Sequence, residues 1–264
     1  MRKNKMMRAA SALLVAVLLT TSTISGTFAK YVTEASGQDE ARVAKWGVEV
    51  SAFTNELFAK TYAKTEDTSI ENTVVADEKV VAPGTTHKDG GLKFVLKGTP
   101  EVATRVEIAI TNLAGNDVPV EVKLPAKNGY TDYTVATGVA TDGKAVYGTF
   151  DLASDYYPVK FYLKDSVGTV IKEGTLSEIE AFINEKLEND SFPGDGKNGE
   201  YAAGTILDNI LGGDGIYTIT WEWIFDGDDR ADTYLGNVAA GTVTDGDAII
   251  NIEFALSIKV TQIN

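Results

Sequence analysis

Apolar and polar residues alternate along several stretches of the chain, and this alternation is its strongest structural signal. It is clearest over residues 217–225 and 250–261, where apolar side chains occupy every second position. Successive side chains of a β-strand point to opposite faces, so each run predicts a strand with one buried face. Shorter runs with strand character cover residues 46–52, 92–97, 106–110, 118–124, 157–163 and 169–172. We therefore expect eight to ten strands.

A turn-forming sequence separates two of these runs. Residues 112–117 read NLAGND, between the alternating runs at 106–110 and 118–124. Two alternating runs joined by turn residues predict a β-hairpin. Pro119 indicates an edge or the start of a strand, because proline has no backbone N–H to donate.

One stretch has helical rather than strand periodicity. Apolar side chains recur at spacings of three and four residues from Leu176 to Leu187. Thr175 precedes this run, and Glu178 follows three residues later, which is the pattern of a capping box at a helix start. The spacing predicts one amphipathic helix over about residues 176–189, placed as an insertion among the strands.

The fold that best fits many strands and one helix is an all-β antiparallel sandwich, jelly-roll-like in its topology. No linker or repeat interrupts the chain, so we expect a single domain over residues 43–264. Polar, Thr- and Gly-rich stretches at 61–90 and 125–150 predict long loops or lateral insertions. The hydrophobic content of 44% is sufficient for a core of that size.

The first 29 residues have the composition of a secretory signal peptide. Four basic residues lie within the first eight, and an apolar run follows over residues 9–24. That run is shorter than the roughly 20 apolar residues that span a bilayer, and the TFA at residues 27–29 fits the small-x-small rule of a signal-peptidase site. We predict cleavage between Ala29 and Lys30; the alternative is an uncleaved N-terminal anchor.

The charge of the chain excludes some classes of partner. Removing residues 1–29 removes four of the 24 basic residues and none of the 38 acidic ones, which changes the net charge from −14 to −18. Such a chain repels nucleic acid and anionic lipid, because binding to phosphates needs an excess of Lys and Arg. The chain has no cysteine, so a secreted form depends on its core rather than on disulfides.

Residues for metal-dependent or nucleophilic catalysis are scarce. The single histidine, His87, lies in a loop-like segment and is expected to be solvated, so the paired histidines of a zinc protease are missing. No Gly-x-Ser-x-Gly motif is present. Glu222 resembles an acid in an aromatic cleft, but strand alternation places Trp221 and Trp223 on the core face and Glu222 on the solvent face.

An acidic segment offers weak calcium candidates, and we expect no other cofactor. Four carboxylates follow the strand at 217–225, and oxygen-rich loops of this kind hold calcium in other proteins. The spacing does not match a calcium-loop signature, and acidic turns are expected on the surface of so acidic a chain. The candidates are Asp226, Asp228, Asp229 and Asp232.

Sequences at both ends of the chain resemble those of a known family. The segments SGTFAKY at 25–31 and ARVAKWGV at 41–48 resemble the N-termini of the TasA/camelysin family, and WEWIF at 221–225 with DTYLGN at 232–237 resembles a motif of clostridial members. The resemblance implies a jelly-roll β-sandwich that a Gram-positive bacterium secretes after cleavage by a dedicated signal peptidase. It also implies a matrix protein that polymerises into biofilm fibres, in which the freed N-terminal arm adds as a strand to the next subunit. Camelysin-type relatives are labelled metalloproteases.

Residues 30–42 correspond to that arm, because they are polar and lack any clear period. The assembly residues would begin with Lys30, Tyr31, Val32, Thr33 and Glu34. We therefore expect a secreted structural protein of the cell surface or biofilm matrix, without enzymatic activity and without a membrane anchor after cleavage. Its partners would be further copies of itself and related matrix proteins.

Two alternatives to a fibre subunit remain open. One is a camelysin-like secreted metalloprotease, which the missing histidine ligands disfavour. The other is a monomeric surface module that binds calcium or glycans through residues 226–232.

Overall fold

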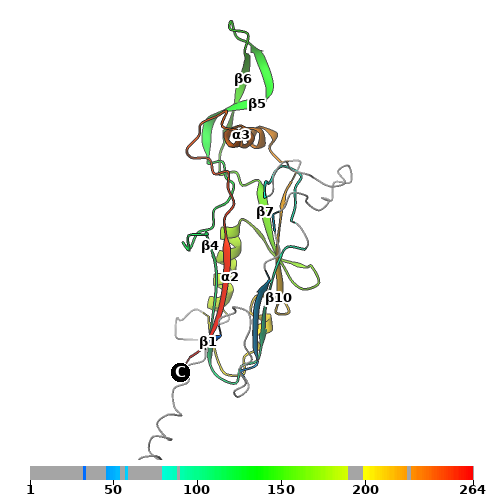
Figure 1. Cartoon of the computed structure of the whole chain (residues 1–264), viewed down its shortest axis with the longest axis vertical. Coiled ribbons are helices and arrows are strands. Elements are labelled where there is room, and N and C mark those ends of the chain that lie inside the picture. The colour runs from blue at the N-terminus through cyan, green and yellow to red at the C-terminus, as the bar shows by residue number, and fades with distance from the viewer. Residues whose placement is uncertain are drawn as a thin grey trace, which may run out of the picture.

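The computed structural model describes residues 32–33, 46–53, 57–58, 79–87, 90–189, 199–224 and 227–263. Within them the protein is mostly β, with antiparallel sheets and two α-helices (Figure 1). The helices are α2 (Leu176–Asn189) and α3 (Asp229–Ala239), with a short 3₁₀-helix η1 (Leu207–Asn209). The strands are β1 (Val32–Thr33), β2 (Val48–Phe53), β3 (Leu92–Gly98), β4 (Thr104–Thr111), β5 (Lys127–Val139), β6 (Ala145–Leu152), β7 (Val159–Lys164), β8 (Val170–Gly174), β9 (Glu200–Tyr201), β10 (Ile216–Trp223) and β11 (Ala255–Gln262).

Most strands belong to two antiparallel sheets. The first has four strands in the order β1-β11-β4-β9, and the second has five in the order β2-β3-β10-β7-β8. In the first sheet, β4 and β11 pair from Thr111 opposite Ala255 to Thr104 opposite Gln262. In the second sheet, β10 is central and pairs with β3 and β7. Neighbours in both sheets are therefore often distant in the sequence.

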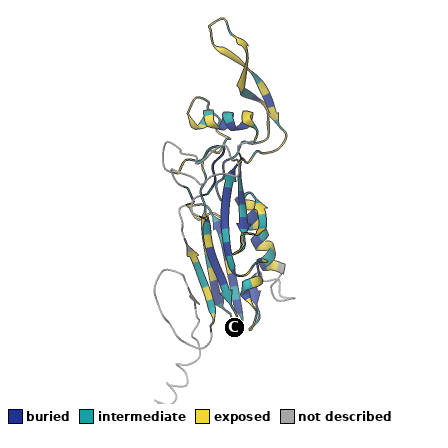
Figure 2. Cartoon of the chain, turned by 90° about the vertical axis from the view of Figure 1, so that its right-hand side faces the viewer, coloured by how far each residue is buried: buried dark blue, intermediate teal, exposed yellow. Residues whose placement is uncertain are grey.

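The apolar faces of the two sheets contribute to one core. Phe161 of β7 meets Phe254, which precedes β11, with 6.1 Å between ring centroids. Trp221 of β10 is fully buried, and its indole N–H donates to the carbonyl of Leu57 at 3.0 Å. Helix α2 packs against β4, β7 and β8 and covers this core with its apolar side. Figure 2 shows buried residues concentrated along the sheets, while the far end of the β5–β6 hairpin is exposed.

The predicted helix is confirmed with its cap. α2 begins at Leu176, directly after Thr175. The Glu178 backbone N–H donates to the Thr175 hydroxyl at 3.1 Å, and the Thr175 N–H donates to the Glu178 carboxylate at 2.9 Å. These two bonds satisfy donors that would otherwise have no partner at the helix start. The apolar positions of the helix, Leu176, Ile179, Ile183 and Leu187, are all buried.

The predicted hairpin between residues 106–110 and 118–124 is wrong. β4 forms as predicted, but residues 118–124 belong to neither sheet and make only isolated bridges, for example Val120 with Glu253 and Leu124 with Tyr156. β4 pairs instead with β11 on one side and with the short strand β9 on the other. The strand expected over 250–261 correspondingly begins only at Ala255, because residues 249 and 253 bridge to this segment.

Of the two alternatives expected for residues 125–150, a long loop or a lateral insertion, the second fits the structure, because most of this segment forms a β-hairpin. β5 and β6 pair with each other alone, with register shifts along their length, and they project from the end of the molecule (Figure 1). Aromatic rings hold the base of the hairpin on α3: Tyr130 stacks on Phe150 at 5.3 Å and meets Tyr234 of α3 edge-on at 4.8 Å. The hairpin is therefore an insertion anchored at one end.

The second helix, α3, was not predicted. Its sequence, DRADTYLGNVA, belongs to the segment expected as an acidic loop, because Asp226 and Asp228 precede it and Asp229 and Asp232 lie within it. The apolar positions Ala231, Tyr234, Leu235 and Val238 have helical spacing and pack on the core. Asp228 is the N-cap, whose carboxylate accepts from the backbone N–H groups of residues 230 and 231. A cap followed by helical spacing was thus the available signal.

A remote carboxylate also caps α2. Glu121 is buried, and its side chain accepts from the Leu176 N–H at 2.6 Å and from the Ser177 hydroxyl at 3.2 Å. Burial raises the pKa of Glu121, while the bonds from residues 176 and 177 oppose that rise. Through Glu121, residues 118–124 are hydrogen-bonded to the start of α2.

We expect Glu121→Ala to lower the free energy of unfolding by about 1–3 kcal/mol, because it leaves buried donors of α2 without a partner. Urea denaturation followed by circular dichroism measures this change. The matched control is Glu185→Ala on the exposed side of α2, which should change stability by no more than about 0.5 kcal/mol. Equal losses in the two variants would contradict a specific capping role for Glu121.

Candidate functional site

Among the described residues, the outer edge of β11 is partly covered by another strand. On its inner side β11 pairs with β4 over its whole length. On its outer side it pairs with β1, with Val32 opposite Thr261 and Thr33 opposite Val260. Within the described residues, no strand pairs with Ala255–Lys259 on that side. Figure 1 shows β1 at the end of the molecule opposite the hairpin, next to the C-terminus.

The other edge of the first sheet has a similar form. β9 pairs only with Thr104 and Arg105 of β4, and the Val106 N–H donates to the Gly199 carbonyl at 2.7 Å just before β9 begins. Gly199 has a positive φ of 75°, and a Cβ there would lie 2.1 Å from the Val106 carbonyl oxygen. This close approach explains why a glycine precedes β9.

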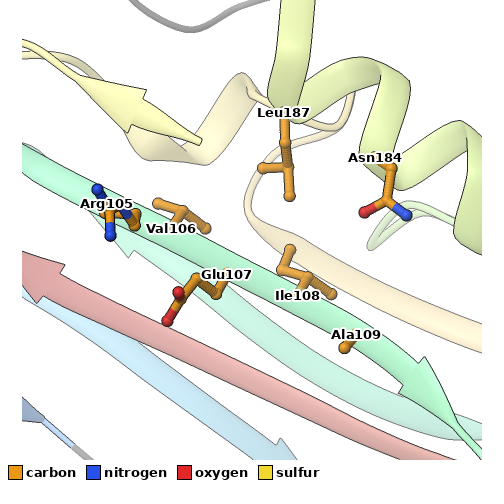
Figure 3. Close-up of a pocket in the computed structure, with 7 residues that line it drawn as sticks. All are labelled: Arg105, Val106, Glu107, Ile108, Ala109, Asn184 and Leu187. Carbon is orange, nitrogen blue, oxygen red and sulfur yellow. The ribbon is translucent and has the colours of Figure 1, made fainter. Parts of the chain in front are cut away.

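A pocket lies where β9 leaves β4 uncovered. It has a volume of about 430 Å³ and is lined by residues 105–109 of β4 and by Asn184 and Leu187 of α2. In Figure 3, Leu187 points from α2 toward Val106 and Ile108. An ion pair between Arg105 and Glu200 joins β4 to β9 at one end of the pocket. Both outer strands of this sheet, β1 and β9, are thus two residues long.

An incompletely paired edge can accept a further strand. Its free backbone N–H and C=O groups supply hydrogen bonds, and the side chains beside it set the register. Of the predicted assembly residues, Val32 and Thr33 lie at this edge as β1. The predicted cleavage pair Ala29 and Lys30, together with Tyr31 and Glu34, lies outside the described residues.

The acidic calcium candidates do not converge on one point. Asp228 caps α3 and forms an ion pair with Arg230 at 3.0 Å, Asp229 is in the first turn of the helix, and Asp226 lies outside the described residues. Asp232 is buried, and its Oδ1 accepts from the Tyr156 hydroxyl at 2.8 Å. No group of three or more potential metal-ligating side chains occurs in the part of the chain that the structure describes.

The tryptophans around Glu222 face the core, as predicted. Trp221 and Trp223 are buried, whereas Glu222 is half-buried on the opposite face and bonds to the Tyr162 hydroxyl. The prediction for His87 is wrong in one respect: its side chain is half-buried rather than solvated. The His87 backbone N–H donates to the Trp221 carbonyl at 3.1 Å, and burial lowers the pKa of its imidazole.

A polar group inside the core was missed by sequence reasoning. Asp232 is only 8% exposed, and burial raises the pKa of its carboxyl. The nearby indole of Trp223 interacts with this carboxyl and opposes the rise in its pKa, although Nε1 and Oδ2 do not meet ordinary hydrogen-bond geometry. In the sequence, Asp232 groups with its acidic neighbours as a calcium candidate. Its spacing from Leu235 and Ala239 places the three residues on one face of a helix, and that spacing was the available signal for its burial.

Among the described residues, no helix is both long and apolar enough to cross a membrane. No family model, curated protein or solved structure matches the chain.

We expect Asp228→Ala to lower the free energy of unfolding by about 0.5–2 kcal/mol, because α3 loses its N-cap. Asp228→Asn keeps a capping oxygen and should lose less than about 0.5 kcal/mol, since the exposed pair with Arg230 contributes little. Thermal unfolding of the three proteins measures the difference. A calcium-dependent rise in melting temperature that Asp228→Asn abolishes would show instead that these carboxylates hold a metal.

The burial of Asp232 predicts how stability depends on pH. The folded carboxyl has a pKa above its ordinary value of 3.8, so the folded state binds this proton more readily than the unfolded chain. Stability should therefore rise as the pH falls through the raised pKa and level off below about 3.8. Each unit of difference between the folded and unfolded pKa corresponds to about 1.4 kcal/mol.

We expect Asp232→Asn to lack this dependence, so that the wild type loses stability relative to the variant as the pH rises from about 4 to 7. Urea unfolding of both proteins across that range is the measurement. A stability difference that stays constant, or that changes with pH in the opposite direction, would contradict the shifted carboxyl.

Proposed function

We propose that the mature chain is a secreted structural protein of a Gram-positive cell surface or biofilm matrix, a TasA/camelysin-type fibre subunit without enzymatic activity. Its polymerisation joins copies by addition of the N-terminal arm to the first sheet of the next subunit. The observation that carries the proposal is the outer edge of β11, where arm residues Val32 and Thr33 are already bound while Ala255–Lys259 pair with no described strand on that side. Related matrix proteins with the same arm are further partners.

The strand order supports a jelly-roll-like sandwich. A jelly roll places its first, eighth, third and sixth strands in one sheet, and its second, seventh, fourth and fifth in the other. Without β2 and the hairpin, the strands of this chain in sequence order are β1, β3, β4, β7, β8, β9, β10 and β11. The observed orders β1-β11-β4-β9 and β3-β10-β7-β8 then match both sheets. In this scheme β1 holds the place of the first strand, which is the strand that a neighbour would supply.

The register of β1 supports a particular alignment of the donated arm. Val32 opposite Thr261 and Thr33 opposite Val260 are antiparallel pairs. Extending that register by one pair places Glu34 of a donated arm opposite Lys259, and opposite charges across a strand pair are favourable. Lys259 also pairs with Glu107 of β4 at 3.0 Å. Residues 34–38 of the arm would cover the remainder of the edge, down to Ala255.

The arm is tested by comparing proteins that begin at Lys30 and at Val43. We expect filaments in electron micrographs of the longer protein only, because the shorter one keeps the acceptor edge but has no strand to donate. Circular dichroism checks that both proteins are folded. Equal polymerisation of the two proteins would overturn assembly through the arm.

Strand exchange between subunits is tested with single cysteines, which the chain allows because it has none of its own. Val32→Cys and Thr261→Cys occupy paired positions, so mixing the two variants under mild oxidation should give a disulfide-linked heterodimer that mass spectrometry maps to these positions. The matched control replaces Val32→Cys by Val167→Cys, in the exposed turn between β7 and β8. A yield no greater than that of the control would show that β1 stays on its own chain.

A further inference from the structure

The β5–β6 hairpin extends well past the aromatic rings that hold its base on α3. We call residues 134–147 the distal hairpin; every one of them except Ala140 is exposed. Among the described residues, neither β5 nor β6 pairs with any strand other than its hairpin partner. A two-stranded hairpin without further packing is only marginally stable in water. The described part of its own chain therefore gives the distal hairpin little support.

The distal hairpin is apolar and nearly free of charge. Val135 and Val139 are 69% and 74% exposed, and Val146 and Tyr147 of β6 are exposed as well. Its sequence holds one acidic and one basic residue, both in the turn between the strands, so its net charge is zero. Natural sheet edges are usually protected by charged residues or proline, and an exposed apolar edge indicates a place where another chain binds.

The neutrality of the distal hairpin favours a second copy of this chain as its partner. Residues 30–264 carry a net charge of −18, so two copies repel each other where their charged surfaces meet. A segment with balanced charges adds least to that repulsion. A basic partner, in contrast, would be drawn to the acidic surfaces elsewhere on the chain and would gain nothing from a neutral hairpin.

The length of the arm limits where a second copy can lie, and this step rests on the function proposed above. In the register of β1, residue 38 of a donated arm lies opposite Ala255, at the end of β11 away from β1. The described part of the donor resumes at Trp46, eight residues later. Eight residues span at most about 29 Å. The fold of the donor therefore begins within about 29 Å of Ala255 of the acceptor.

The hairpin covers a similar distance on the same side of the acceptor. Figure 1 shows α3 and the hairpin beyond the end of the red strand β11 that lies away from β1. From Tyr130, which packs on α3, to Val139, β5 extends over about 30 Å at roughly 3.3 Å per residue. The hairpin thus reaches about as far past the acceptor as the arm can hold the donor. A donor held by its arm lies beside the hairpin rather than beyond its tip.

We propose that the distal hairpin is a second contact between neighbouring subunits, and that its apolar residues pack on the subunit that donates the arm. The arm and the hairpin then cross one junction in opposite directions, one from each subunit. Strand pairing sets the register of the junction, and the hairpin keeps the two subunits from rotating about a single extended linker.

A charge on the hairpin tests this contact in the chain that begins at Lys30. We expect Val139→Glu to raise the protein concentration at which filaments form at least about tenfold, which corresponds to about 1.4 kcal/mol at each junction, because it places a charge in an apolar contact. Sedimentation of the filaments measures this concentration. The matched control is Val167→Glu, which adds the same charge in the exposed turn between β7 and β8 and should change it less than about twofold. Circular dichroism checks that both variants are folded.

The cysteine pair Val32→Cys and Thr261→Cys reports on the arm separately. We expect its disulfide to form between subunits in the Val139→Glu background as well, because this substitution leaves the arm and β11 unchanged. A disulfide together with equal polymerisation of Val139→Glu and Val167→Glu would overturn the hairpin contact and leave the fibre proposal standing. If no disulfide forms even without the hairpin substitution, both proposals are wrong.

Cross-linking locates the surface that the hairpin contacts. Val139→Cys, labelled with benzophenone maleimide, is polymerised with ¹⁵N-labelled protein, so that mass spectrometry distinguishes links between copies from links within one chain. We expect links to the ¹⁵N-labelled copy in the filaments, and none when both proteins begin at Val43, because that form keeps the hairpin but has no arm. A hairpin left in solvent, or kept for a partner of another kind, would give links only within its own chain and would overturn the proposal.

Discussion

Eight consecutive residue pairs join β4 to β11, two strands that lie about 150 positions apart in the chain. Much of the remaining structure follows from this ladder. The local partner expected for β4, residues 118–124, is not in the sheet. That segment instead makes isolated bridges and carries Glu121, which caps α2. On the side away from β4, the strand that pairs with β11 in the described part of the chain is the short β1.

The parts that could be predicted are those that depend on one segment alone. Residues 92–97 and 217–223 alternate in hydrophobicity and form β3 and β10, and residues 176–189 carry both the apolar spacing and the cap of α2. Alternation shows which face of a strand is buried but not which strand lies beside it. For that reason the sequence predicts that residues 118–124 pair with β4, whereas β4 in fact pairs with β11. The acidic residues around Arg230 favour the prediction of a loop, but Asp228 is the N-cap of helix α3.

The candidate site also has a part that one segment predicts and a part that depends on contacts between distant segments. The polar, unpatterned composition of residues 30–42 predicts an arm, and Val32 and Thr33 of that segment pair with β11. That this segment joins subunits stays a proposal. The burial of Asp232 could be read from its spacing with Leu235 and Ala239, but its place beside Trp223 could not, because α3 and β10 meet only in three dimensions. One face of α3 supports the aromatic base of the hairpin through Tyr234, and another places the Asp232 carboxyl beside Trp223.

The late position of β11 in the chain has a consequence for the timing of the assembly proposed above. Synthesis runs from the N-terminus, so residues 30–42 are made long before the strand whose edge would receive them. Until residues 255–262 have been made and have paired with β4, a chain would have a strand to donate but no edge that could accept one. Under this proposal incomplete chains could not join one another end to end, and a fibre would begin to grow only once β11 is in place, without a separate inhibitor.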